Sequence, residues 1–204
     1  MINHVKSSGG RRVLGVTGGI ASGKTAVLKL LAKSGIPTID ADDLAHACIR
    51  RGKPAYRAIL ARFGSDVLRS DRQIDRRKLG KIVFSDSARR RQLEKIIHPC
   101  VAKGLRQFIR RHQGIIALDI PLLFEARYES WMDLIIVVSS TPAQQLRRLM
   151  RRNRLSRLEA RRRLASQIPL ADKCRRANLV LDNTRTPEWL RDQVEVLVMD
   201  LKRA

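Results

Sequence analysis

The sequence predicts an α/β protein, a three-layer sandwich in which helices cover both faces of a mainly parallel sheet of five strands. Short apolar runs rich in β-branched residues alternate with segments of helical periodicity. The runs show no clean alternation of apolar and polar residues, as expected for strands that are buried on both faces. A glycine-rich loop follows the first run and polar residues follow the others, which marks the ends of the strands.

The first strand is predicted at residues 13–17, and the helix after it at residues 26–33, closing at Gly35. The second strand, residues 36–39, ends at Asp40. The other three strands are predicted at residues 115–118 before Asp119, 134–138 before Ser139, and 179–181 before Asp182.

Three helices after the third strand have clear start signals. Thr141 is a candidate N-cap, followed by Pro142 at the first helical position, and Gln144 completes a capping box. A second capping box pairs Ser156 with Glu159, and Thr186 followed by proline repeats the cap-plus-proline signal.

Between the second and third strands, about seventy-five residues contain no convincing strand. Their apolar spacing predicts helices at residues 49–63, 76–84, 88–97 and 101–109. We expect a helical subdomain at about residues 40–113, over the ligand edge of the sheet. The chain is then a flexible tail, residues 1–12, followed by one domain, residues 13–204.

Composition excludes some classes of protein. With 204 residues and 44% hydrophobic content the chain can build a substantial core, and no apolar run approaches the ~20 residues needed to cross a bilayer. The net charge of +23 attracts polyanions of any kind, so non-specific polyanion binding is possible. Cys48, Cys100 and Cys174 are few and far apart, which predicts thiols in a reducing cytoplasm rather than a disulfide or zinc framework.

Residues 18–25 read Gly-Gly-Ile-Ala-Ser-Gly-Lys-Thr and fit the phosphate-binding loop G-x-x-x-x-G-K-[ST] of P-loop NTPases. The strand before the loop and the helix after it supply the setting that this loop requires, with backbone N–H groups directed at phosphate oxygens. Lys24 would bridge the outer phosphates of ATP, and the Thr25 hydroxyl would hold Mg²⁺. The predicted ATP-binding residues of the loop are Gly18, Gly19, Ile20, Ala21, Ser22, Gly23, Lys24, Thr25 and Ala26.

Carboxylates beyond the strand ends are the next candidates, because ligands of open α/β sheets bind there. Asp42 could accept or orient the proton of a substrate hydroxyl during phosphoryl transfer. Asp119 could lie near Mg²⁺, either directly or through water. For Asp40 and Asp43 we expect helix capping instead.

An arginine-rich pair of helices after the fourth strand, about residues 142–168, has the character of a closing lid. Arg148 and Arg152 lie four residues apart on one helix face and are candidates for stabilising the transferring phosphoryl group. Most other arginines there are expected to be solvated. His98, beside Pro99, falls between two predicted helices and is a candidate ligand contact.

Taken together, these residues resemble the dephospho-CoA kinase family over about residues 13–183. The resemblance rests on an ordered set of segments: residues 17–25, 39–46, 75–79, 83–84, 98–99, 119–125, 145–148 with Arg152, 167–173, and 182–183.

The resemblance implies ATP-dependent phosphorylation of the ribose 3′-hydroxyl of dephospho-CoA, with Mg²⁺. Asp42 matches the general base of the family, and Leu122, Leu123, Phe124 and Glu125 match the segment that lines the coenzyme A side. Arg148 matches a lid arginine at the ATP phosphates, Asn183 falls in the ATP site, and the helical insertion matches the substrate-binding domain.

Two alternative functions remain at this point. The first is a kinase for a nucleotide or another small hydroxyl compound. The second is a nucleic-acid-binding protein that uses ATP as a switch, although aromatic residues are only 4% of the chain and supply little for base stacking.

Overall fold

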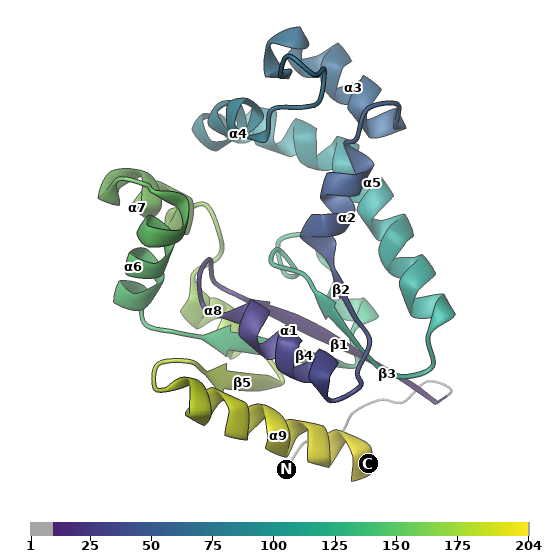
Figure 1. The fold of residues 1–204 in the computed structure, drawn as a ribbon, viewed down its shortest axis with the longest axis vertical. Helices are drawn as coiled ribbons and strands as arrows, with labels where there is room; N and C mark the ends of the chain where they lie inside the picture. Colours follow the sequence, from purple (N-terminus) through teal and green to yellow (C-terminus); the bar gives the residue numbers. More distant parts are fainter. Residues whose placement is uncertain (1–9, 204) are drawn as a thin grey trace. The chain divides into compact units, whose positions relative to one another are not determined.

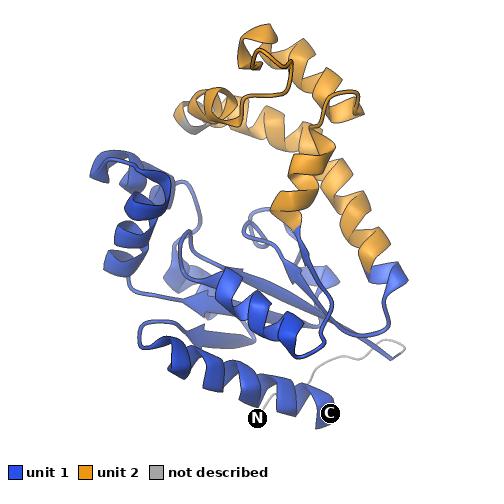
Figure 2. Cartoon of the chain, in the orientation of Figure 1, with its two compact units in different colours: residues 1–40, 109–204 blue, residues 41–108 orange. Residues whose placement is uncertain are grey.

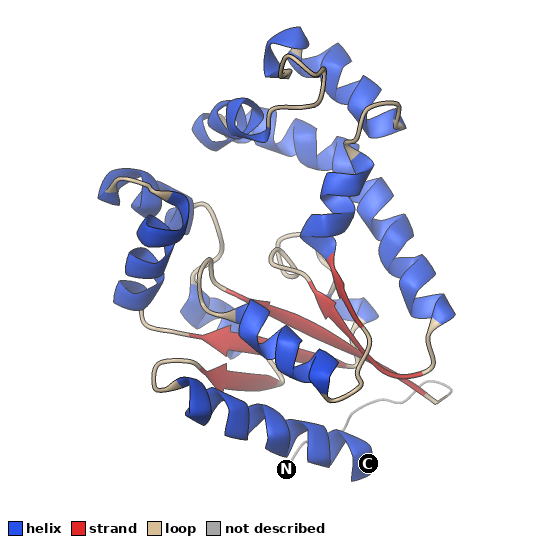
Figure 3. Cartoon of the chain, in the orientation of Figure 1, coloured by secondary structure: helices blue, strands red, loops and turns tan. Residues whose placement is uncertain are grey.

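The computed structural model describes residues 10–203 and contains a five-stranded parallel sheet (Figures 1 and 3). The strand order is β2-β3-β1-β4-β5, and neighbouring strands pair parallel throughout. The strands are β1 (Arg11–Gly18), β2 (Thr38–Asp40), β3 (Gly114–Asp119), β4 (Leu134–Ser139) and β5 (Leu179–Asp182). The predicted fold class and all five predicted strands are confirmed.

The helices are α1 (Lys24–Lys33), α2 (Ala41–Cys48), α3 (Pro54–Phe63), α4 (Arg76–Ser85), α5 (Ser87–Arg111), α6 (Pro142–Asn153), α7 (Arg157–Ala165), α8 (Leu170–Arg175) and α9 (Pro187–Arg203). Both predicted capping boxes, Thr141 with Gln144 and Ser156 with Glu159, are present. No helix within residues 10–203 is long and apolar enough to cross a membrane.

The chain divides into two compact units (Figure 2). Unit 1 contains the sheet and comprises residues 1–40 and 109–204, and unit 2 comprises residues 41–108. The helical insertion was expected at about residues 40–113. The expected N-terminal tail, residues 1–12, lies largely outside the described residues, and Arg11 and Arg12 begin β1.

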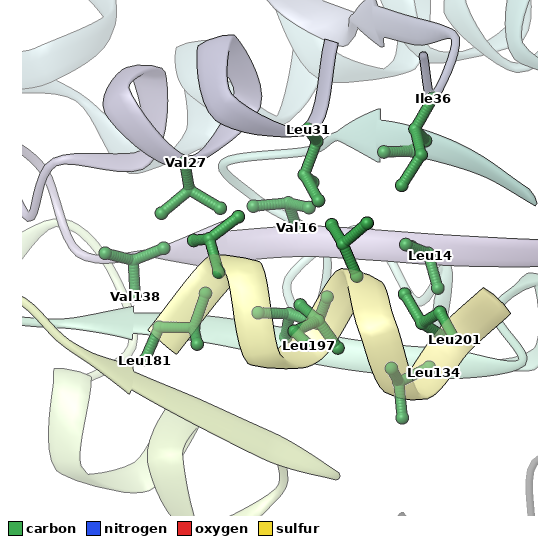
Figure 4. Packing of buried hydrophobic residues seen from close by; sticks show 14 of the residues in the cluster. Leu14, Val16, Val27, Leu31, Ile36, Leu134, Val138, Leu181, Leu197 and Leu201 are labelled. Carbon is green, nitrogen blue, oxygen red and sulfur yellow. The ribbon is translucent and has the colours of Figure 1, made fainter. Parts of the chain in front are cut away.

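The core of unit 1 lies between the sheet and two helices that cover the same face (Figure 4). Val27 and Leu31 of α1 pack with Leu197 and Leu201 of α9 against alternate strand residues such as Val16. Because successive strand residues point to opposite faces, Thr17 lies on the other face, where α8 contacts β1 and β4. The helices therefore enclose the sheet from both sides.

Unit 2 has its own apolar core, in which Tyr56 and Ile59 of α3 pack with Leu79 and Val83 of α4. Two sequence predictions are wrong in this unit. The helix predicted at residues 49–63 begins only at Pro54, as α3, and residues 49–53 form the turn that follows α2. The two helices predicted on either side of Pro99 form one helix, α5, which continues through the proline although proline removes a backbone donor.

The expectation of three thiols is also wrong, because Cys48 and Cys100 form a disulfide. The two cysteines are 52 residues apart in the sequence, and the packing of α2 beside α5 brings them together. Cys174 is free and half-buried, and burial raises the pKa of its thiol.

Candidate functional site

The carboxyl ends of the parallel strands form one edge of the sheet. Asp119 at the end of β3 pairs with Asp40 at the end of β2, and Ser139 on β4 pairs with Asp182 on β5. Gly18 ends β1, the central strand, between these two pairs. The strand ends that the sequence marked therefore line the edge where ligands of α/β sheets bind.

The phosphate loop, residues 18–25, connects β1 to α1 at this edge (Figure 1). Gly23 is the N-cap of α1, so no side chain caps the helix, and the first turn contains no acidic residue. The positive end of the helix dipole therefore meets no carboxylate of that turn, as an anion site requires. Lys24 is half-buried at the first helical position, and Thr25 beside it is exposed.

Side chains from two other elements hold the loop by its carbonyl groups. Gln145 of α6 donates from Nε2 to the Ile20 carbonyl at 2.8 Å. Asn183, after β5, donates from Nδ2 to the Ser22 carbonyl at 2.7 Å, a contact that is buried. These bonds fix the path of the loop before any nucleotide binds, which lowers the cost of ordering it around phosphate.

Arg148 also reaches the loop, whereas Arg152 does not contact it. The Arg148 guanidinium donates to the carbonyls of Ser22 and Asn183, each at 3.4 Å, the long end of the hydrogen-bonding range. Arg152 is exposed one turn further along α6 and donates to Asn153.

Gln145 is the residue of this cluster that sequence reasoning did not assign. Gln145 belongs to the segment 145–148 that carries the family resemblance, but the sequence suggests no role for it. The available signal was its spacing, because Gln145 lies three residues before Arg148 and therefore on the same face of α6.

Asn183, by contrast, was assigned to the ATP site, and its segment is firmly held. Asp182 accepts from the Thr184 amide at 2.9 Å, and Gln193 bonds the backbone of Asp182. Burial acts to raise the pKa of Asp182, but hydrogen bonds from Thr184 and Trp189 outweigh it and the net pKa is lowered. Since the folded-state pKa lies below the unfolded one, Asp182 stabilises the fold above its unfolded pKa and loses this effect as pH falls through the folded pKa.

Asp119 and Thr25 were predicted as magnesium ligands, and their chemistry fits that ion. Asp119 is 5% exposed at the end of β3, so its carboxylate is nearly removed from bulk water. No group of three or more His, Cys, Asp or Glu side chains suited to a metal occurs within residues 10–203. Magnesium sites in kinases need no such group, because one or two protein oxygens and the substrate phosphates suffice.

The segment after β3 was predicted to contact the acceptor through residues 122–125. Leu123 is 0% and Phe124 3% exposed, so their side chains pack inside unit 1, while Leu122 is half-buried. The Glu125 carboxylate forms an ion pair with Lys173 of α8 at 2.8 Å. Contact between this segment and the acceptor stays a prediction.

The remaining predicted site residues, Asp42 and His98, belong to unit 2. Asp42 is exposed in the first turn of α2, where a carboxylate interacts favourably with the helix dipole. The neighbouring Asp43 lies 3.9 Å from His46. His98 is half-buried within α5, two residues before the disulfide-bonded Cys100.

Comparisons with known proteins agree with this geometry. The family model for dephospho-CoA kinase matches residues 12–188. A dephospho-CoA kinase of Bacillus cereus is 44% identical over 190 residues, covering 91% of this chain and 95% of that protein. One of Arabidopsis thaliana is 38% identical, covering 94% and 84%. Among solved structures, a dephospho-CoA kinase from Campylobacter jejuni has a TM-score of 0.70 at 29% identity, covering 95% of this chain and 98% of that one.

Proposed function

The chain belongs to the dephospho-CoA kinase family, and from this premise we propose which of its residues carry the reaction. As a member of that family it is an ATP-dependent kinase that catalyses the last step of coenzyme A synthesis. The phosphoryl group passes from ATP to the ribose 3′-hydroxyl of dephospho-CoA.

We propose that the phosphate loop binds the phosphates of ATP. The observation that supports this is the local structure of the loop. The loop has no capping side chain at α1, and Gln145 and Asn183 fix its carbonyl groups. Lys24 and Arg148 would neutralise the charge that spreads over the transferring group. Arg152 would join them only if α6 moves, because it is exposed and bonded to Asn153.

Asp42 is the proposed base for the acceptor. Its carboxylate would orient the 3′-hydroxyl and accept its proton as the new bond to phosphorus forms. The residues that the resemblance implies for binding of dephospho-CoA are His98, Leu122, Leu123, Phe124 and Glu125. Of these we assign His98 and Leu122, because the other three side chains are engaged within unit 1.

The proposed cofactor is Mg²⁺, held by the Thr25 hydroxyl and by Asp119, directly or through water. When bound with ATP it would supply charge neutralisation at the β- and γ-phosphates. We also propose a cytoplasmic location, which cell fractionation with an antibody against the chain would check.

The test of the catalytic assignment is the Asp42→Asn variant in a coupled ADP-release assay with dephospho-CoA. We expect turnover to fall by about 10²–10⁴-fold, the usual contribution of a general base, with calorimetric ATP affinity nearly unchanged. Asp43→Asn is the matched control, because it removes the adjacent exposed carboxylate of the same helix turn. Turnover of Asp42→Asn within about threefold of the wild type would remove Asp42 from this role.

The same assay separates the proposed acceptor from its rivals. ADP formation should be strong with dephospho-CoA and weak with nucleoside monophosphates. A nucleic-acid switch would instead show ATPase activity that RNA or DNA stimulates, with a steep dependence of binding on salt. Non-specific polyanion binding would appear as salt-sensitive retention on heparin without any such stimulation.

A further inference from the structure

Lys173 is a lysine with a fully buried side chain, 0% exposed, in the short helix α8. An ammonium group in such surroundings is costly unless charged or polar partners surround it. Lys173 has two partners. Its Nζ donates to Oε1 of Glu125 at 2.8 Å and to the carbonyl of Pro121 at 3.1 Å.

Each of these two partners also accepts a second hydrogen bond from another part of unit 1. The Pro121 carbonyl also accepts from the hydroxyl of Thr17 at 3.2 Å, and Thr17 immediately precedes the phosphate loop. Oε1 of Glu125 also accepts from the Ile168 amide at 3.1 Å, and Ile168 lies between α7 and α8, where the arginine-rich segment ends.

We call these five residues the Lys173 junction: Thr17, Pro121, Glu125, Ile168 and Lys173. The ammonium group of Lys173 thereby connects three parts of unit 1 by hydrogen bonds. They are the strand before the phosphate loop, the segment after Asp119, and the connection from α7 to α8, which we call the lid return. All five residues lie in unit 1.

The geometry of this ion pair does not suggest that its main role is to raise the free energy of unfolding. Oε2 of Glu125 is buried and has no hydrogen-bond partner among the described residues. Apolar side chains of similar size often replace a buried ion pair with no loss of stability, or with a gain. The charge pair is therefore better explained by the geometry that it imposes on its partners than by stability.

We propose that Lys173 is a positioning residue for phosphoryl transfer, and that it acts by fixing the segment after β3 and the lid return against the phosphate loop. The inference rests on the proposed function and deepens it. Glu125 then acts through Lys173 and Ile168 rather than by touching dephospho-CoA. A shift of the Pro121 carbonyl would displace Asp119 and the loop relative to each other, and misplacements of about 1 Å in active sites cost about 100-fold in rate.

The test compares Lys173→Met with the double variant Lys173→Met/Glu125→Leu. The single variant leaves the Glu125 carboxylate buried without its ammonium partner, so its melting temperature should fall. The double variant removes both charges and should regain most of that loss. Its kcat should nevertheless stay about 100-fold below the wild type, with KM for ATP changed much less.

Hydrogen exchange gives a local readout that does not depend on turnover. The Ile168 amide should exchange faster in the double variant, since its acceptor is gone, while amides of the sheet keep their protection. Arg175→Met is the matched control, because it removes an exposed ion pair with Asp172 from the same helix and should leave kcat and exchange unchanged.

Two results would overturn the proposal. If the double variant regains both melting temperature and kcat, the two charges only neutralise each other in the interior and do not position the site. If Lys173→Met keeps wild-type kcat, the junction does not position the site. A wild-type protein that forms no ADP with dephospho-CoA would instead count against the proposed function. Faster Ile168 exchange in the double variant would then still support the junction, and unchanged exchange would contradict it.

Discussion

Gly23 adopts a left-handed backbone conformation, with φ of 107°, at the point where the phosphate loop enters α1. A Cβ atom at this position would lie 2.0 Å from Nδ2 of Asn183, the group that bonds the Ser22 carbonyl. Two requirements therefore coincide at one residue. The backbone needs glycine for its conformation, and Asn183 needs the space that a side chain would occupy.

The Gly23→Ala variant should bind ATP at least about tenfold more weakly, because left-handed strain and displacement of Asn183 together exceed ~1.4 kcal/mol. Isothermal calorimetry measures this directly. Gly35→Ala is a matched control, since Gly35 also has a positive φ, 83°, but nothing lies within 4 Å of an added Cβ. An ATP affinity in Gly23→Ala equal to that of Gly35→Ala would contradict the steric argument.

At this scale the sequence predicted residues whose chemistry is local. The phosphate loop and its Lys24 follow from a contiguous motif, and Asp42 and Asp119 follow from strand ends. Gln145 and Lys173 could not be assigned in the same way, because their roles arise from partners that are distant in the sequence. From the sequence alone, Lys173 cannot be distinguished from the many lysines and arginines expected on the surface.

The elements α2 and α5 are joined at two successive turns. Cys48 is bonded to Cys100, and one turn along each helix Gly104 allows close approach of Leu44, whose Cδ2 would lie 2.9 Å from an added Cβ. Helix α2 also carries Asp42, about 9 Å along the helix axis from Cys48. The disulfide thus restrains the element that presents the proposed base.

Reduction of this disulfide should destabilise unit 2. The bond spans 52 residues, a loop for which chain entropy predicts about 4 kcal/mol of stabilisation. Melting curves with and without dithiothreitol would test this, and Cys100→Ser should melt like the reduced protein. Cys174→Ser, at the free cysteine, should keep the full response to reductant. Identical curves in both conditions would show that the bond does not contribute.

Elements were predicted well where a strong local pattern exists. The five strands stand out because buried parallel strands are short, apolar and bounded by polar residues. The break at residues 49–53 had a local signal that was missed, because Gly52 has a positive φ, 86°, and Pro54 stands at the start of α3. The continuation of α5 through Pro99 was missed because tertiary packing rather than local preference decides it. The disulfide was missed for the same reason, since its two cysteines meet only when α2 and α5 pack.

The whole molecule carries a formal charge of +23, while both proposed substrates are anions. Such a surface raises the local concentration of anionic ligands, and salt screens this effect, with a Debye length of about 10 Å at 0.1 M falling to about 3 Å at 1 M. The charge should therefore favour capture of substrate more than the chemical step.

Raising sodium chloride from about 0.05 M to about 0.5 M should increase KM for both substrates several-fold and leave kcat nearly constant. Steady-state kinetics at saturating magnesium would measure this. Sucrose at matched osmolality is the control and should leave KM unchanged. A KM that stays constant across the salt series would show that the net charge plays no part in substrate capture.

Unit 2 is inserted in the chain between β2 and β3, and these two strands are direct neighbours in the sheet. Because the two strands are parallel, the insertion leaves at the carboxyl end of β2 and the chain returns at the amino end of β3, on the opposite edge of the sheet. Joining those two ends takes a crossover of about a dozen residues or more. The part of the molecule assigned to the alcohol can thus vary in length and sequence over evolutionary time down to that crossover, while the half assigned to the nucleotide stays intact.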